Sequence, residues 1–207
     1  MTQPFCKYEF LGPYRQKYFS GGGVQGLYKE LQQILDQFPT VGALIDFGCG
    51  DGAIGVRLAK RGLMVYGIDI DEIGLKYAKE YAVSMKVENQ ITFEKKSVYD
   101  DFSANAFDYG LCTLLMEIIP SPSLGLQLML SRVKKWILVT FVESRIKDPM
   151  ANQIWKNKEE VELFLKECNV KFELVFSIPP EDNNSSRQEI LKKGPGVERV
   201  LYYKIFK

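Results

Sequence analysis

The chain has 207 residues, of which 46% are apolar and 26% are charged, and these values are typical of one soluble globular domain. Its 27 Lys and Arg residues against 26 Asp and Glu residues give a formal net charge of +1, which argues against sequence-independent binding to nucleic acid. The sequence contains no histidine. Serine–histidine and cysteine–histidine catalysis are therefore excluded, as is every histidine-ligated metal site.

The cysteines and the apolar segments favour a protein of the cytoplasm. Four cysteines are scattered without a C-x-x-C pair, at Cys6, Cys49, Cys112 and Cys168. No basic-then-apolar signal segment opens the chain, so we interpret them as reduced thiols. The stretch from Tyr109 to Ser131 carries a single charge, but prolines divide it into pieces too short to cross a membrane.

The first residues differ in character from the rest. Residues 1–23 are rich in aromatic side chains without a clear period and end in three glycines, which predicts an N-terminal arm on a flexible hinge. Apolar residues then recur at helical spacing over residues 24–38, up to Pro39, which predicts an amphipathic helix. We interpret residues 24–207 as one domain.

Strands and helices then alternate along the chain. We predict strands at residues 43–47, 63–68, 91–95, 107–113, 136–142, 171–178 and 199–206. Helices are predicted from the first glycine turn to Lys60, over residues 72–85, from Pro122 to Val133, and around Val161 to Cys168. The fold class is therefore α/β, a doubly wound sheet of seven mostly parallel strands. Because a long polar stretch without helical period joins the last two strands, we expect the last strand to be antiparallel.

The most informative segment is Ala43 to Gly52, in which a short apolar strand ends in a glycine-rich turn and opens a helix. Glycines allow a ligand to approach the backbone closely, and ligands of α/β sheets bind just beyond the carboxyl ends of the strands. The next strand ends at Asp69, where a carboxylate can accept hydrogen bonds from both hydroxyls of a ribose. The sequence therefore predicts a nucleoside-binding site.

Two classes of ligand fit a glycine turn of this kind. Gly50, Gly52 and Gly55 match the G-x-G-x-x-G pattern of nicotinamide and flavin dinucleotide sites. Asp46 and Asp51, however, place carboxylates beside the turn, where they would repel a pyrophosphate and attract an ammonium or sulfonium group. A nucleoside with a positively charged tail therefore fits the turn better than a dinucleotide.

The acidic residue, spacer and G-x-G of this turn resemble the first motif of the class I S-adenosylmethionine (SAM)-dependent methyltransferases, and ordered landmarks extend the likeness over residues 40–142. The resemblance implies a Rossmann-like methyltransferase fold, with SAM as the cofactor and no metal ion. Asp46 would orient the amino group of the cofactor. The backbone at Gly48, Cys49 and Gly50 would line its methionine part.

The same resemblance assigns the nucleoside end of the site. Asp69 would hold the ribose, and Ile70 would pack on the adenine. The family commonly has an acidic residue near the adenine amino group at the position aligned with Ser97, so in this chain the contact passes to the backbone of Val98. Cys112, at the end of the fourth strand, would emerge beside the sulfonium as a small filler rather than a nucleophile.

Methyl transfer requires an aligned acceptor, whereas a general base is optional. Glu117 is the only charged residue between Tyr109 and Ser131 and follows the fourth strand, so it is our candidate for contacting the acceptor. A residue that only braces a short helix before Pro120 is the alternative. Tyr18 is the second catalytic candidate, on an arm that either closes over the cofactor as a lid or packs on the helix surface.

We therefore expect a cytoplasmic SAM-dependent methyltransferase that transfers a methyl group to a small-molecule acceptor by in-line displacement. A protein or tRNA acceptor is the alternative within the family. From other classes, the alternatives are an NAD-dependent oxidoreductase and a cofactor-binding module without catalysis.

Overall fold

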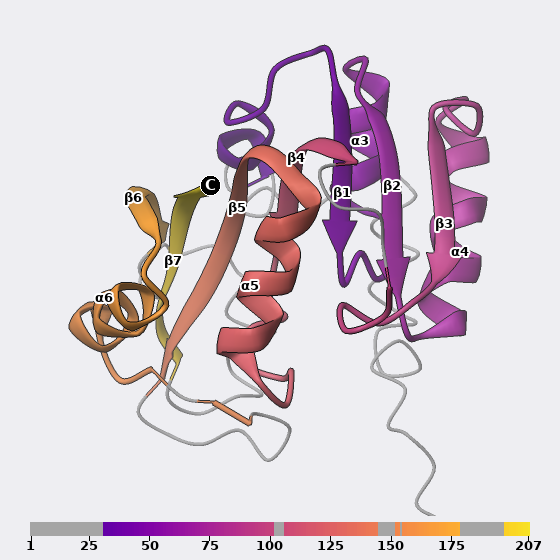
Figure 1. The fold of residues 1–207 in the computed structure, drawn as a ribbon. Helices are drawn as coiled ribbons and strands as arrows, with labels where there is room; N and C mark the ends of the chain where they lie inside the picture. The colour runs from indigo at the N-terminus through magenta and orange to yellow at the C-terminus, as the bar shows by residue number, and fades with distance from the viewer. Residues whose placement is uncertain (1–30, 102–105, 145–151, 154, 179–196) are drawn as a thin grey trace, which may run out of the picture.

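The computed structural model describes residues 31–101, 106–144, 152–153, 155–178 and 197–207. Within these residues, seven strands form a single sheet in the order β3-β2-β1-β4-β5-β7-β6 (Figure 1). The strands are β1 (Ala43–Phe47), β2 (Met64–Asp69), β3 (Ile91–Lys95), β4 (Phe107–Cys112), β5 (Val133–Ser144), β6 (Lys171–Ile178) and β7 (Val197–Phe206). β1 to β5 pair in parallel, whereas β7 lies antiparallel between β5 and β6. The predicted sheet with an antiparallel last strand is confirmed.

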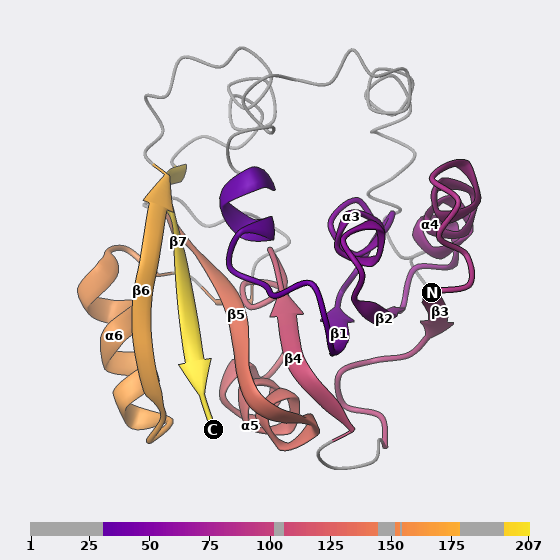
Figure 2. The ribbon, with the colours of Figure 1, turned by 90° about the horizontal axis from the view of Figure 1, so that it is seen from above.

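Helices cover both faces of this sheet (Figure 2). α3 (Gly55–Lys60) and α4 (Glu72–Ser84) lie on one face with a helical segment at residues 31–35, and α5 (Pro122–Arg132) and α6 (Lys158–Glu167) lie on the other. Each face has its own cluster of buried apolar side chains, so the central strands are buried on both sides and are mostly apolar. Among the described residues, no helix has the length and apolar character needed to cross a membrane.

The carboxyl ends of the parallel strands meet at one edge of the sheet, toward which the arrows of β1 and β2 point downward in Figure 1. From β1 the chain passes to β2 on one side, and it later returns to β4 on the other side. Ligands of open α/β sheets bind at such a change of direction, just beyond the carboxyl ends of the strands. The loops after β1, β2, β3 and β4 therefore define the place of a ligand site.

The predicted strands recur in the structure with small shifts at their ends. The largest shift concerns β5, which we predicted from Trp136 and which begins at Val133. The assignment of Val133 to the preceding helix was wrong, because this residue adopts an extended backbone and pairs with Phe107 of β4. Val133 is fully buried, and burial alone does not distinguish a helix end from a strand start. Residues 1–30, with the predicted arm over residues 1–23, lie outside the described residues.

Candidate functional site

The glycine turn lies directly after β1, at the edge formed by the carboxyl ends of the parallel strands. Gly48, Gly50 and Gly52 have backbone φ angles of 68°, 55° and 71°, which glycine adopts without strain and other residues rarely adopt. The N–H groups of Gly48 and Cys49 both donate to the carbonyl oxygen of Ile68 on β2, at 2.8 and 3.0 Å. The turn is therefore fixed to the end of β2 before it leads into α3.

Asp46, near the end of β1, is only 2% exposed. The absence of a side chain at Gly55 leaves room for it, since a Cβ atom there would lie 2.9 Å from Oδ2 of Asp46. The backbone N–H of Gly55 also donates to the Asp46 carboxyl group. Burial, followed by the negative charges of Asp69 and Asp51, raises the pKa of Asp46 to about 7. This carboxyl group therefore changes its charge near neutral pH, and a cation bound beside it favours the ionised form.

Asp69 ends β2 beside the turn. Its Oδ2 accepts the N–H of Gly50 at 2.8 Å, and its Oδ1 accepts the N–H of Asp71 at 2.9 Å. Each carboxylate oxygen has a further lone pair, so the side chain is held in one orientation and can still accept hydrogen bonds from a ligand diol. The next residue, Ile70, is an apolar side chain that is 69% exposed at this edge. Asp69 is partly exposed, and the ribose contact of Asp69 and the adenine contact of Ile70 stay predictions.

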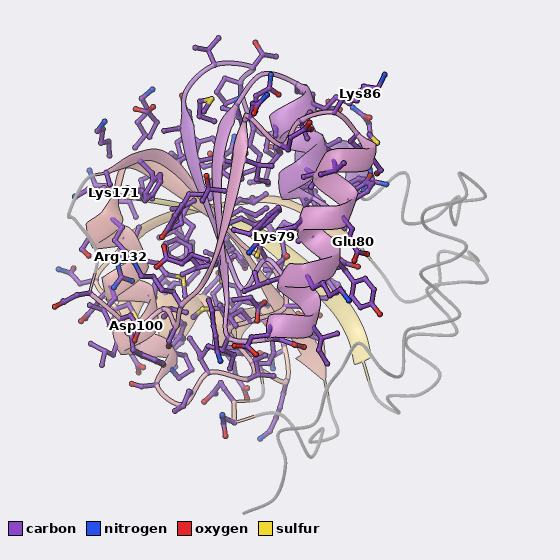
Figure 3. The ribbon with its side chains drawn as sticks, turned by 90° about the vertical axis from the view of Figure 1, so that its right-hand side faces the viewer. Lys79, Glu80, Lys86, Asp100, Arg132 and Lys171 are labelled. Atoms are coloured by element: carbon purple, nitrogen blue, oxygen red, sulfur yellow. The ribbon has the colours of Figure 1, made fainter. Side chains whose placement is uncertain are left out.

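The segment after β3 uses most of its polar groups within the protein. The N–H of Ser97 donates to Oδ2 of Asp100 at 2.8 Å, and the Ser97 hydroxyl accepts the N–H of Tyr99 at 3.2 Å. The carbonyl oxygen of Val98 accepts the buried Arg132 guanidinium at 2.6 Å, and the same group reaches the Asp100 carbonyl at 2.7 Å (Figure 3). The hydroxyl hydrogen of Ser97 and the N–H of Val98 are the groups left for a nucleobase, and that contact stays a prediction.

Both cysteines of the predicted site are buried. Cys49 is 9% exposed and Cys112 is fully buried. Burial raises the pKa of both thiols, and nearby carboxylates add to the effect, those of Asp46 and Asp69 at Cys49 and those of Glu117 and Asp46 at Cys112. A thiol that stays protonated is a poor nucleophile, so these side chains fill space, while the contact of Cys112 with a sulfonium stays a prediction.

Glu117 lies in the loop after β4, and a hydrogen bond to its side chain connects this loop to β5. Its Oε1 accepts the N–H of Val142 at 2.7 Å. Its carbonyl oxygen accepts the N–H groups of Asn152 and Gln153 at 2.7 and 3.1 Å, and Nδ2 of Asn152 donates to the carbonyl of Ile118 at 2.5 Å. Glu117 thus braces the loop after β4 against β5, rather than a short helix before Pro120, and its contact with an acceptor stays a prediction. A carboxylate has two oxygens with two lone pairs each, so the hydrogen bond from Val142 is compatible with a second role toward an acceptor.

Sequence reasoning assigned no role in the SAM site to three residues that shape it. They are Gly55 beside Asp46, Arg132 beneath the segment after β3, and Thr140, whose buried hydroxyl accepts the N–H of Leu114 in the loop after β4 at 2.7 Å. The spacing from Asp46 to Gly55 is a signal that could have been used. Arg132 and Thr140 act across 34 and 26 residues of sequence, and no local pattern marks such contacts. Tyr18 lies outside the described residues.

The profile of the methyltransferase domain family matches residues 42–193. The match covers most of the chain, and the chain therefore belongs to that family. This membership confirms the predicted family, the SAM-dependent methyltransferases, and SAM as the cofactor of that family. It lends no support to an NAD-dependent oxidoreductase, for which Gly50, Gly52 and Gly55 were the argument.

Two curated relatives match parts of the chain. The ubiquinone biosynthesis O-methyltransferase of Alkalilimnicola ehrlichii is 35% identical over 83 residues, which are 39% of this chain and 32% of that protein. The ribosomal protein L11 methyltransferase of Acetivibrio thermocellus is 28% identical over 145 residues, which are 69% of this chain and 46% of that protein. The chain thus spans less than half the length of either relative.

A solved structure supports the fold independently. The magnesium protoporphyrin IX methyltransferase of Synechocystis, with bound SAM, superposes with a TM-score of 0.63. The superposition covers 93% of this chain and 83% of that chain at 18% identity. At this identity the likeness concerns the fold alone, and it confirms the Rossmann-like methyltransferase architecture.

The described residues fit the cofactor of this family. The buried carboxyl group of Asp46 suits a positively charged tail, the fixed carboxylate of Asp69 suits a diol, and the exposed side chain of Ile70 offers an apolar surface to a base. Within the described part of the chain, no group of three or more acidic or thiol side chains could hold a metal ion.

Replacement of Asp46 by Asn tests the origin of its shifted pKa. The carboxyl group has a pKa of about 7 in the folded chain against 3.8 for the unperturbed group, so the folded state binds its proton more tightly than the unfolded state. Its contribution to stability is therefore present below pH 4 and is lost as the pH rises through about 7. We expect the Asp46→Asn variant to be more stable than wild type at pH 8, on the order of 1 to 3 kcal/mol.

Urea unfolding between pH 4 and pH 8 measures this difference. Asp36→Asn is the matched control, because Asp36 is an exposed carboxylate remote from the turn, and its curve should run parallel to that of wild type. An Asp46→Asn variant whose stability changes with pH as wild type does would show that Asp46 is ionised at all these values.

Proposed function

We propose that this chain transfers a methyl group from SAM to a small-molecule acceptor. The observation that carries the proposal is the pair of carboxylates, Asp46 and Asp69, on two sides of a glycine turn where the strand order changes direction. Asp46 is suited to the cationic end of the cofactor and Asp69 to its ribose. Among the described residues, the cysteines are free and buried, which supports the proposed cytoplasmic location.

Different residues of the chain bind different parts of SAM. When bound, SAM supplies a methyl group on a sulfonium, an electrophile strong enough to need no further activation. Asp46 orients the amino group, the backbone of residues 48–50 lines the methionine part, and Asp69 holds the ribose. These contacts fix the direction in which the methyl group points, which is the main requirement of an in-line displacement.

The acceptor is proposed to bind at the loop after β4. Glu117 is held there through one oxygen by the N–H of Val142, so the side chain has a defined place at the ligand edge. Its carboxylate can orient an acceptor or take a proton from it. The carbonyl groups of Glu117 and Ile118 are bound by residues 152–153, which keeps the loop in place. A braced loop favours the alignment on which the reaction depends.

The relatives support two classes of acceptor. The name of the A. ehrlichii enzyme refers to the biosynthesis of a small molecule, ubiquinone, and that of the Synechocystis enzyme to magnesium protoporphyrin IX. The A. thermocellus relative is named for a ribosomal protein and matches a larger share of the chain than the A. ehrlichii relative does, which makes a protein acceptor the second candidate. Incubation with isotopically labelled SAM, followed by separation of small molecules from protein, distinguishes the two.

Replacing Asp69 tests the cofactor site. Asp69→Ala removes the charged acceptor for the ribose hydroxyls and is expected to weaken the binding of S-adenosylhomocysteine (SAH) by about 2 to 3 kcal/mol. Calorimetric titration measures this change. Asp71→Ala is the matched control, because Asp71 caps α4 two residues away through its own side chain and should lose stability without losing affinity. Equal SAH affinity in Asp69→Ala and wild type would overturn the assignment of Asp69.

Replacing Glu117 separates its two roles. A Gln side chain still accepts the N–H of Val142 but cannot take a proton, so Glu117→Gln should leave the melting temperature and SAH affinity near those of wild type. If Glu117 acts as a base, kcat falls by about a hundredfold or more. The measurement is the rate of methyl transfer to the acceptor found with labelled SAM. An unchanged kcat would assign Glu117 to bracing alone.

A further inference from the structure

Leu114 has a backbone conformation that its local structure does not explain. Among the described residues other than glycine, Lys86, Leu114 and Asn169 have positive φ angles, of 59°, 55° and 54°. Lys86 and Asn169 each follow the C-cap residue of a helix, a position at which a left-handed residue commonly ends the helix. Leu114 instead follows β4, and a branched side chain is strained in this conformation. Strained backbone persists only where surrounding contacts hold it, and it is concentrated at functional sites.

Thr140 on β5 supplies the contact that holds Leu114. Its side chain is fully buried, and its Oγ1 accepts the N–H of Leu114 at 2.7 Å. A buried N–H without this acceptor would remain unsatisfied, which is costly. The hydroxyl therefore fixes the turn by which the chain leaves β4, and the bond from Val142 to Glu117 fixes the same loop further on.

The turn at Leu114 connects the two halves of the site. The next side chain, Leu115, lies against Gly48, since a Cβ atom at Gly48 would be 3.1 Å from Cδ1 of Leu115. On its other side, Gly48 donates its N–H to the carbonyl of Ile68. The glycine turn is thus held between β2 and the loop after β4. The position of that loop depends on the conformation of Leu114.

We infer that Thr140 is a positioning residue for the methyl-transfer site. Thr140 acts through Leu114 and holds the glycine turn and the loop after β4, which carries Glu117, in fixed positions relative to each other. The hydroxyl makes no ligand contact in this role. It fixes the backbone of the loop after β4. From this loop the side chain of Leu115 packs against the glycine turn, and the side chain of Glu117 extends toward the proposed acceptor. The inference rests on the proposed function, because it assumes that the glycine turn binds SAM and SAH.

The test compares Thr140→Val with Thr140→Ser in the full chain, using SAH affinity by calorimetry and melting temperature as readouts. Val keeps the shape and branching of Thr and removes the hydroxyl, whereas Ser keeps the hydroxyl. We expect Thr140→Val to bind SAH about tenfold more weakly and Thr140→Ser to bind within about twofold of wild type. Leu138→Val is the matched control, since Leu138 is a fully buried residue on the same strand and should lose stability without losing SAH affinity.

The outcomes separate the inference from the proposed function. Wild-type chain that does not bind SAH contradicts the proposed function, whereas wild-type binding with unchanged affinity in Thr140→Val overturns only the inference. Equal losses in Thr140→Val and Leu138→Val, or in Thr140→Val and Thr140→Ser, also overturn it. If Thr140→Val does not fold, the change is made together with Leu114→Gly, which removes the strain. That double variant should bind SAH more weakly than Leu114→Gly alone, and equal affinity overturns the inference.

Discussion

The carboxyl group of Asp46 is the group around which the site is arranged. It lies near the end of β1, almost without exposure, and two further carboxylates, Asp69 and Asp51, lie close enough to oppose its ionisation. A buried charge is costly unless a partner compensates it, and the N–H of Gly55 offsets only part of this cost. A ligand with a positive charge supplies the missing compensation. The cost of ionising the buried Asp46 carboxyl group thus becomes a preference for a cation beside it.

The same carboxylates favour SAM over a dinucleotide at this glycine turn. The glycine turn lets a ligand approach the backbone closely, as a dinucleotide site also requires. The glycines therefore do not discriminate between SAM and a dinucleotide. A pyrophosphate placed on this turn would lie near Asp46 and Asp51 in a partly desolvated place, where the repulsion is large. The family match agrees with the ligand that the charges favour.

The strand, turn and carboxylates of this site were predictable because their pattern is local. An apolar run that ends in glycines predicts β1 and its turn, and the alternation of strands with helices places Asp69 at the same edge of the sheet. The antiparallel β7 was predictable for a different reason, since a parallel connection would need a crossover helix that the polar stretch before it does not encode.

The contacts that hold the site together were not predictable from sequence. The carbonyl of Val98 is bound by Arg132, and the N–H of Leu114 by Thr140, through pairs of residues brought together only by the finished sheet. The two roles open to Glu117 also depended on tertiary contacts, because its hydrogen bond from Val142 joins the loop after β4 to β5. The spacing of apolar residues and the composition of turns carry no information on hydrogen-bonded pairs that lie far apart in the sequence.

The most direct test of this account is a calorimetric titration of the chain with SAM and with NAD at pH 6 and pH 8. Because ionised Asp46 attracts a cation, the account predicts that SAM binds at both pH values and binds more tightly at pH 8, while NAD does not bind. Binding of NAD alone would contradict the account. So would SAM affinity that is equal at the two pH values, because Asp46 would then not be the group that recognises the charge of the ligand.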